Sequence, residues 1–181
     1  MRIVAGDWRG RALTAPPGAT TRPTADRVRQ ALFDMLIHAP WAGRECLEGA
    51  VVLDLFAGTG GLGLEALSRG AKSCIFVEKD RDALIALRAN IAACKATERC
   101  TVIGGDAMTI VVRGSANLIF LDPPYGLDLT PRALERLRAA GAIAPGALIV
   151  AETGRGDTSP HPEPLDQRRH GKATLTIWRE N

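Results

Sequence analysis

The sequence predicts an α/β fold: a mostly parallel, doubly wound sheet with a C-terminal antiparallel hairpin and a small N-terminal extension. From residue 50 onward, short apolar runs alternate with segments of helical periodicity. Such alternation is typical of parallel strands that helices cover on both faces. The end of the chain, DQRRHGKATLTIWRE, has two β-like segments around Gly171. The 181 residues suffice for one domain with its own core.

Local patterns justify each element in turn. Thr24 is a favourable N-cap, and the residues after it carry apolar side chains at helical spacing. The predicted strands are 50–56, 73–80, 100–107, 117–126 and 147–153, and the predicted helices are 25–38, 61–70, 81–95 and 131–141. Residues 1–20 are predicted as a hairpin or extended arm. Residues 154–165 are predicted as a loop where a final crossover helix is missing.

Composition narrows the class of protein. A hydrophobic fraction of 46% and a charged fraction of 24% are those of a soluble globular domain. The opening MRIVAGDWRGR lacks the apolar core of a signal peptide, and no apolar run is long enough to span a membrane. A cytoplasmic, monomeric protein with no membrane partner is therefore expected. The cysteines and histidines are scattered without ligand spacing, so no metal site is expected.

The positive charge is concentrated at the start of the chain. The net charge is +3, and residues 1–30 contain six arginines against two aspartates. The rest of the chain is close to neutral. A basic arm on a neutral body indicates a polyanionic partner such as nucleic acid, although a merely solvated basic terminus would have the same composition.

The stretch VVLDLFAGTGGLGLEAL, residues 51–67, places a glycine-rich turn between a strand and a helix. Gly58, Gly60 and Gly63 match the spacing of a dinucleotide fingerprint, and the same strand–turn–helix unit can hold S-adenosylmethionine. Glu78 ends the next strand, where an acid can bond ribose hydroxyls. Asp106 follows the third strand, within reach of an adenine amino group. These features suit either cofactor.

Asp54 separates the two cofactors. It lies four residues before Gly58. A carboxylate there would repel the pyrophosphate of a nicotinamide dinucleotide and would attract the ammonium and sulfonium of S-adenosylmethionine. The alternative is an aspartate that only braces the loop by accepting backbone N–H groups.

A second set of residues, LDPPYG at 121–126, follows the fourth predicted strand. The prolines stiffen the turn and lack N–H groups, Asp122 offers a carboxylate acceptor, and Tyr125 offers a flat apolar face. Two acceptors beside a stacking ring suit a planar exocyclic amine of adenine, guanine or cytosine. A rigid loop without catalytic function is the alternative.

These motifs carry a family resemblance. DLFAGTG, Glu78, Asp106 and DPPY resemble the Rossmann-like class I S-adenosylmethionine-dependent methyltransferases that act on exocyclic amines of nucleobases. The segments RIVAGDWRGRALTAPPG, RPTADRVRQALFDML, LDLFAGTGGLGLEALSRGA and FLDPPY further resemble, in that order, the bacterial guanine-N2 methyltransferases of small-subunit ribosomal RNA, the RsmD family. The resemblance covers residues 2 to 153 and resumes weakly in HGKATLTIW.

The resemblance implies a function and a set of site residues. It implies methyl transfer from S-adenosylmethionine, leaving S-adenosylhomocysteine, to N2 of a guanine in 16S ribosomal RNA, within the small subunit or an assembly intermediate. Residues 1–45 would be an RNA-gripping extension, and residues 46–181 the methyltransferase domain. The implied catalytic residues are Asp122, Pro123, Pro124 and Tyr125; the implied cofactor residues are Asp54, Gly58, Gly60, Glu78, Asp106 and Ala107; the candidate phosphate contacts are Arg9, Arg11, Arg22, Arg27 and Arg29.

Other functions remain open on the sequence alone. A DNA adenine-N6 methyltransferase would share the DPPY chemistry, but the short chain has no recognisable target-recognition domain. A methyltransferase of glutamine side chains would be expected to carry Asn in place of Asp122. A nicotinamide-dependent oxidoreductase fits the glycine spacing but gives DPPY and the basic arm no role. A non-catalytic RNA-binding protein would not need Asp122 or Tyr125.

Overall fold

The sheet has seven strands in the order β3-β2-β1-β4-β5-β7-β6. The computed structural model describes residues 1–16, 23–124, 127–154, 157, 160–171 and 173–180. Neighbouring strands from β3 to β5 are parallel, whereas β7 pairs antiparallel with both β5 and β6. The direction of winding reverses between β1 and β4. In parallel sheets a ligand binds beside such a switch point, at the carboxyl ends of the strands.

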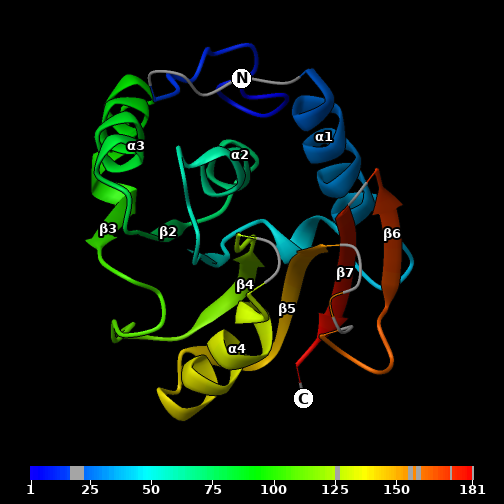
Figure 1. Cartoon of the computed structure of the whole chain (residues 1–181). Coiled ribbons are helices and arrows are strands. Elements are labelled where there is room, and N and C mark those ends of the chain that lie inside the picture. The colour runs from blue at the N-terminus through cyan, green and yellow to red at the C-terminus, as the bar shows by residue number, and fades with distance from the viewer. Residues whose placement is uncertain (17–22, 125–126, 155–156, 158–159, 172, 181) are drawn as a thin grey trace.

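The elements follow the predicted order (Figure 1). The strands are β1 Val51–Asp54, β2 Ser73–Glu78, β3 Cys100–Gly104, β4 Ala116–Leu121, β5 Ile143–Gly154, β6 Asp166–His170 and β7 Ala173–Arg179. The helices are α1 Pro23–His38, α2 Gly61–Ser68, α3 Arg81–Ala93 and α4 Leu129–Ala139, with short 3-10 turns at Arg44–Cys46 and Thr97–Arg99. Strand β4 ends at Leu121, because Pro123 and Pro124 cannot donate to a ladder.

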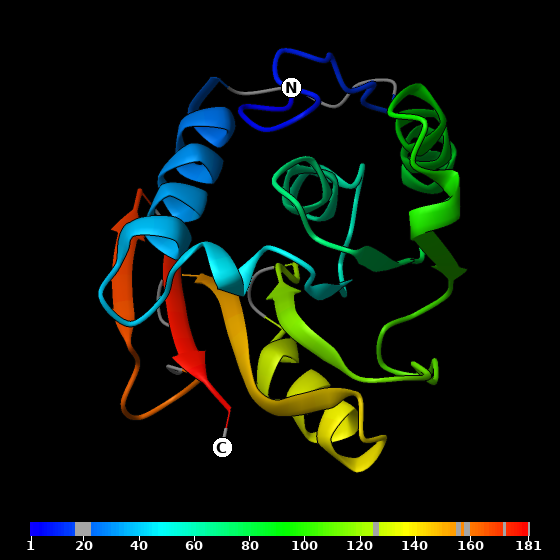
Figure 2. The ribbon, with the colours of Figure 1, turned by 180° about the vertical axis from the view of Figure 1, so that it is seen from behind.

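Helices cover both faces of the sheet. The three helices α1, α2 and α3 lie on one face and α4 lies on the other (Figures 1 and 2). Phe33, Leu64 and Leu87 pack from the first face against strand side chains such as Phe120, while Leu134 belongs to the separate cluster on the second face. The nearly continuous burial along β4 and β5 explains why these strands read as unbroken apolar runs. Within the described residues, no helix is long and apolar enough to cross a membrane.

The N-terminal arm, residues 1–16, is an extended strap with one antiparallel bridge, between Arg2 and Ala12. It runs above α2 between α1 and α3 in both views (Figures 1 and 2). Ile3 and Leu13 are buried in the same apolar cluster as the first-face helices. The described residues of the predicted extension, 1–16 and 23–45, therefore contribute to the same core as the sheet, while the RNA-gripping role of residues 1–45 stays a prediction.

The C-terminal β-hairpin is confirmed, with β6 and β7 joined at Gly171. Of the segment 154–165 predicted as a loop, Gly154 instead ends strand β5, and no helix occurs at the other described residues, 157 and 160–165. The pairing of β7 with β5 extends the sheet beyond its parallel part. The hairpin thereby places His170 and Gly171 beside the carboxyl ends of the parallel strands, where they line the same cavity as Asp122.

Candidate active site

A cavity of about 1030 Å³ opens at the carboxyl ends of β1, β4 and β5. Its floor includes the glycine turn after β1, and its walls come from α1 and from the β6–β7 hairpin. Its polar and charged lining residues are Arg29, Asp54, Thr59, Asp122, Glu152, Arg169 and His170. Of the predicted site residues, it brings together Asp54, Gly58 and Asp122, and Arg29, predicted as a phosphate contact, lines it too. A cavity at this position in an α/β sheet is the usual ligand site.

The glycine turn exposes backbone to this cavity. Gly60 is the N-cap of α2 and has a φ of 85°, and a Cβ there would lie 2.5 Å from Leu87 Cδ1. The positive φ favours glycine at that position, and a larger residue would also require the Leu87 side chain to shift. A Cβ placed on Gly58 would meet no described atom within 4 Å. The turn therefore leaves space where a ligand can approach the main chain.

Asp54 occupies the end of β1 and is only 2% exposed. Its Oδ2 accepts the backbone N–H of Gly63 at 3.0 Å, which braces the first turn of α2. Asp54 therefore makes the kind of bracing hydrogen bond that the alternative interpretation of this residue predicts, and the residue also lines the cavity. Burial, reinforced by the charge of Glu78, raises the pKa of Asp54 to about 7, and the Gly63 bond only partly offsets that.

Glu78, Asp106 and Ala107 lie around the outer strands of the parallel sheet. The Glu78 carboxylate accepts three backbone N–H groups, those of Gly58, Lys79 and Asp80, each at 2.7 Å. Glu78 is therefore fixed against the glycine turn. Asp106 is partly exposed, and the Met108 N–H and the Lys79 ammonium lower its pKa. Ala107 is buried at 8% exposure.

Asp122 follows β4, which lies on the other side of β1 from β2 and Glu78, and it lines the cavity. Asp122 is an exposed residue that lines the open cavity, where neighbouring protein atoms partly desolvate its carboxyl group. This desolvation, together with the charges of Glu152 and Asp54, raises the pKa of Asp122 to about 7. Pro123 is buried and Pro124 is exposed. Tyr125 lies outside the described residues.

Three acids, Asp54, Asp122 and Glu152, line the cavity together with Arg29 and Arg169. The pKa values of Asp54 and Asp122 are both raised, and the charge of Asp54 contributes to the shift of Asp122. A cation bound there would lower both pKa values. The described residues contain no cluster of three or more His, Cys, Asp or Glu side chains able to hold a metal ion. The arrangement suits an organic cation.

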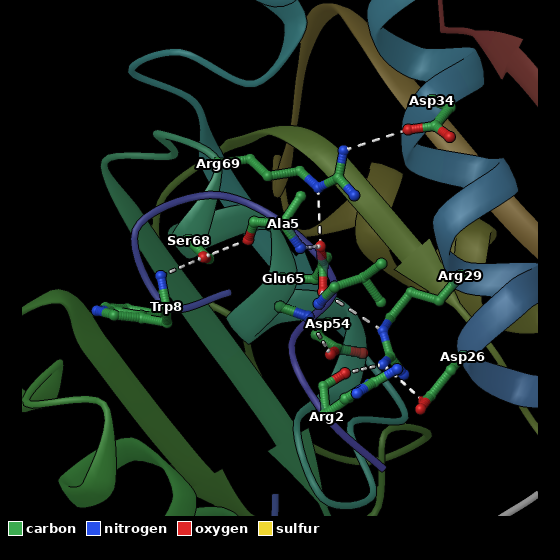
Figure 3. Close-up of polar contacts among 12 residues, drawn as sticks. Arg2, Ala5, Trp8, Asp26, Arg29, Asp34, Asp54, Glu65, Ser68 and Arg69 are labelled. Atoms are coloured by element: carbon green, nitrogen blue, oxygen red, sulfur yellow. Dashed lines mark hydrogen bonds and ion pairs between the residues drawn. The ribbon is translucent and has the colours of Figure 1, made fainter. Parts of the chain in front are cut away.

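Arg29, predicted as a phosphate contact, requires a correction. It is 5% exposed, bonds the carbonyl of Arg2, and pairs with Asp26 at 2.9 Å and Glu65 at 3.6 Å (Figure 3). Its helical position on α1 turns the side chain inward against the arm and α2, so it braces the fold. We remove Arg29 from the set of candidate RNA contacts.

The remaining candidate arginines differ in their surroundings. Arg9 and Arg27 are exposed. Arg11 is exposed too, and its guanidinium donates to the carbonyl of Ala93 at the end of α3. Arg22 lies outside the described residues. Arg9, Arg11 and Arg27 thus stay predictions.

Two buried or cavity-facing acids escaped sequence reasoning. Glu65 is fully buried in α2 and joins three segments of the fold (Figure 3). Its partners are the N–H groups of Val4 and Ala5 and the guanidinium groups of Arg29 and Arg69. Glu152, on β5, lines the cavity beside Asp122. The signal for Glu65 was a single acid inside an apolar helix, and the signal for Glu152 was an acid at the end of the apolar run ALIVA.

Comparison with known proteins decides the family. The family model "Conserved hypothetical protein 95" matches residues 1–179. The ribosomal RNA small subunit methyltransferase D of Escherichia coli strain K12 is 39% identical over 155 residues, covering 84% of this chain and 74% of that protein. The chain belongs to the RsmD family. The predicted resemblance is therefore confirmed.

Further members of the RsmD family agree. The Haemophilus influenzae protein of the same name is 37% identical over 159 residues, covering 84% of this chain and 78% of that protein. The solved structure of yhhF from Escherichia coli is 34% identical and superposes with a TM-score of 0.85, covering 99% of this chain and 97% of that chain. Together with the seven-stranded sheet, this confirms the predicted fold class.

Proposed function

We propose that the protein transfers a methyl group from S-adenosylmethionine to the exocyclic N2 of a guanine in 16S ribosomal RNA. The observation that carries the proposal is the position of Asp122, a desolvated carboxyl group at the switch point, in one cavity with the glycine turn. The printed names of the RsmD relatives support ribosomal RNA of the small subunit as the substrate.

The cavity fits S-adenosylmethionine on three grounds. Its volume of about 1030 Å³ is ample for the cofactor together with a base. The open main chain at Gly58 gives the ligand a cradle. The raised pKa values of Asp54 and Asp122 show that negative charge is costly in this cavity. A bound cation would reduce that cost, whereas a bound pyrophosphate would add to the repulsion between negative charges. The last point disfavours a nicotinamide dinucleotide.

The cofactor residues would divide the ligand among them. Asp54, Gly58 and Gly60 would hold the methionine part. Glu78 would hold the ribose: a carboxylate has about four lone-pair sites, and three of those of Glu78 are taken by backbone N–H groups. The remaining lone-pair site can accept a hydrogen bond from a ribose hydroxyl, and the backbone bonds already hold the Glu78 carboxylate in place. Asp106 and Ala107 would contact the adenine. Bound S-adenosylmethionine supplies an electrophilic methyl group on sulfur.

Asp122 and Pro123 would activate the target amine. An aromatic amine is a weak nucleophile, because its lone pair is delocalised into the ring. Hydrogen bonds from its two N–H groups to the Asp122 carboxylate and the Pro123 carbonyl would favour tetrahedral geometry and free the lone pair. The Asp122 carboxylate would also stabilise the positive charge that develops on nitrogen. Pro124 stiffens the turn, and Tyr125 would stack on the base. No covalent enzyme intermediate is needed.

RNA binding would use the exposed cations of the first 30 residues. Arg9, Arg11 and Arg27 are the proposed phosphate contacts, and Arg22 joins them on sequence grounds. The target base must be unpaired or flipped out, because its amine is not reachable in line within a duplex. Part of the recognition would then come from the shape of the small subunit or an assembly intermediate. The chain would act as a monomer in the cytoplasm.

The proposal is tested by identifying the methylated nucleoside. Purified protein and methyl-labelled S-adenosylmethionine are offered to small subunits that lack the modification, to naked 16S ribosomal RNA, and to DNA, with Asp122→Ala as the control. We expect N2-methylguanosine from the ribosomal substrate and none with the control variant. Label in methyladenosine, or in DNA alone, would overturn the proposed substrate.

A further inference from the structure

Glu152 lies in the same cavity as Asp122, on the side away from the glycine turn. Strands β4 and β5 are parallel with Leu121 opposite Ala151, so the next residues along, Asp122 and Glu152, are neighbours across the two strands. The order β1-β4-β5 then places Asp122 between the glycine turn and Glu152. The charge of Glu152 reaches Asp122, since it contributes to the raised pKa of that group.

Apolar side chains line part of the cavity together with Glu152, while Arg169 and His170 of the hairpin also line it. Val150 precedes Glu152 by two residues and therefore faces the same side of β5. Leu175, which pairs with Glu152 across β5 and β7, lines the cavity too. From above, α1 contributes Val28 and Leu32. These apolar side chains and the two carboxylates, Asp122 and Glu152, suit a base that presents hydrogen-bond donors at one edge.

We propose that Glu152 is the residue that selects guanine, by accepting its N1–H while Asp122 accepts a hydrogen of the neighbouring 2-amino group. This inference rests on the proposed function and adds the determinant of base specificity. Among the bases that carry an exocyclic amine, only guanine has a ring N–H beside that amine. Adenine has the acceptor N1 and cytosine the acceptor N3 at the matching position, and a carboxylate there would repel either lone pair.

A specificity of this kind is physically strong. A site that hydrogen-bonds a donor of its substrate rejects an analogue without that donor, because the analogue then turns a lone pair toward the negative carboxylate. A hydrogen bond to a charged group contributes about 1.5–3 kcal/mol, or roughly 10- to 150-fold in rate. The neighbouring negative charge of Asp122 strengthens the preference for a ligand edge with adjacent donors.

The sharpest probe is 2-aminopurine. It keeps the 2-amino group of guanine but has an acceptor in place of N1–H. Small subunits are reconstituted around ribosomal RNA with either guanine or 2-aminopurine at the methylated position, and single-turnover rates are measured at saturating S-adenosylmethionine. The enzymes are wild type, Glu152→Gln, and Glu163→Gln. Glu163 is exposed and is not among the residues that line the cavity. The Glu163→Gln variant therefore controls for the change in net charge that Glu152→Gln also makes.

For wild type and Glu163→Gln we expect roughly 10- to 150-fold slower methylation of 2-aminopurine than of guanine. For Glu152→Gln we expect that ratio to fall below about fivefold, because a glutamine amide can accept from guanine N1–H or donate to the acceptor of 2-aminopurine. An unchanged ratio in Glu152→Gln would overturn the inference.

Binding of S-adenosylhomocysteine, measured by calorimetry on the same proteins, separates specificity from cofactor binding. We expect the Kd of Glu152→Gln to stay within about threefold of wild type. A loss of tenfold or more would place Glu152 at the cofactor and overturn the inference. If wild type does not methylate the guanine substrate at all, the proposed function itself fails, which is a different result from an unchanged ratio.

Discussion

Replacing Glu65 with glutamine would test how the N-terminal arm is held. Glu65 is fully buried, accepts two backbone N–H groups of the arm, and pairs with two guanidinium groups that are themselves 5% and 6% exposed (Figure 3). Glutamine keeps the size of the side chain but removes the charge. One of its two terminal atoms becomes a donor that faces other donors, so at least one of these contacts becomes repulsive.

The expected loss follows from this burial. Removing one partner of a buried ion pair costs about 3–5 kcal/mol, because the other charge is left buried and uncompensated. Asp26 and Asp34 retain part of the compensation, since they pair with Arg29 and Arg69 at 2.9 and 3.6 Å. We therefore expect a loss near the lower end, about 3 kcal/mol, which in a domain of this size lowers Tm by roughly 6–12 °C.

The assay is urea unfolding followed by tryptophan fluorescence, with Glu135→Gln as the matched control. Glu135 is an exposed helical residue on α4, so the same chemical change should alter the free energy of unfolding by less than about 0.5 kcal/mol. Limited trypsin digestion adds a local readout, because the exposed arginines of residues 1–16 are cleaved faster when the backbone of the arm is no longer held against the fold. A Glu65→Gln protein within about 1 kcal/mol of wild type, with an equally protected arm, would refute this account of the arm.

Three further predictions concern ionisation and backbone fit. Because the pKa of Asp122 is raised to about 7 and its carboxylate is the active form, kcat/KM should fall as pH drops below 7; a flat profile from pH 8 to 5.5 would contradict this. The neutral form of Asp54 is favoured in the folded state, so Asp54 costs stability as pH rises from about 4 to 7. A shift from 3.8 to about 7 corresponds to at most ~4 kcal/mol, so Asp54→Asn should be more stable than wild type at pH 8 but not at pH 4, and should bind S-adenosylhomocysteine more weakly by calorimetry. Gly6→Ala should lose about 1–3 kcal/mol in urea unfolding, since Gly6 has a φ of 79° and a Cβ there would lie 1.9 Å from the Ser68 carbonyl oxygen; unchanged stability would show that the arm docks differently.

The sheet could be predicted because its determinants are local. Each parallel strand is a short apolar run between turn residues. Because both faces of the central strands are buried, the prediction does not depend on assigning alternate residues to an inner and an outer face. The positions of Asp54, Gly58 and Asp122 followed from the same reasoning, since the carboxyl ends of β1 and β4 meet at the switch point. The family resemblance added the identities of their proposed partners.

The arm and Glu152 could not be predicted in this way. The arm is fixed by contacts about 60 residues apart in sequence, such as those from Val4 and Ala5 to Glu65, and no local pattern specifies such pairs. No local pattern shows which arginines pair inside the fold, and Arg29 was misassigned for that reason. Glu152 becomes a neighbour of Asp122 only through the register of β4 and β5, which requires the assembled sheet.

The central claim is that Asp122 acts on the target amine in a cavity that binds the cofactor independently of it. The most direct test measures two quantities on Asp122→Ala: the Kd for S-adenosylhomocysteine, and the single-turnover rate on unmodified small subunits at saturating S-adenosylmethionine. We expect the Kd to stay within about threefold of wild type while the rate falls roughly 10²- to 10³-fold, as for the loss of one group that stabilises transition-state charge. A rate within about threefold of wild type, with the cofactor bound normally, would contradict the account.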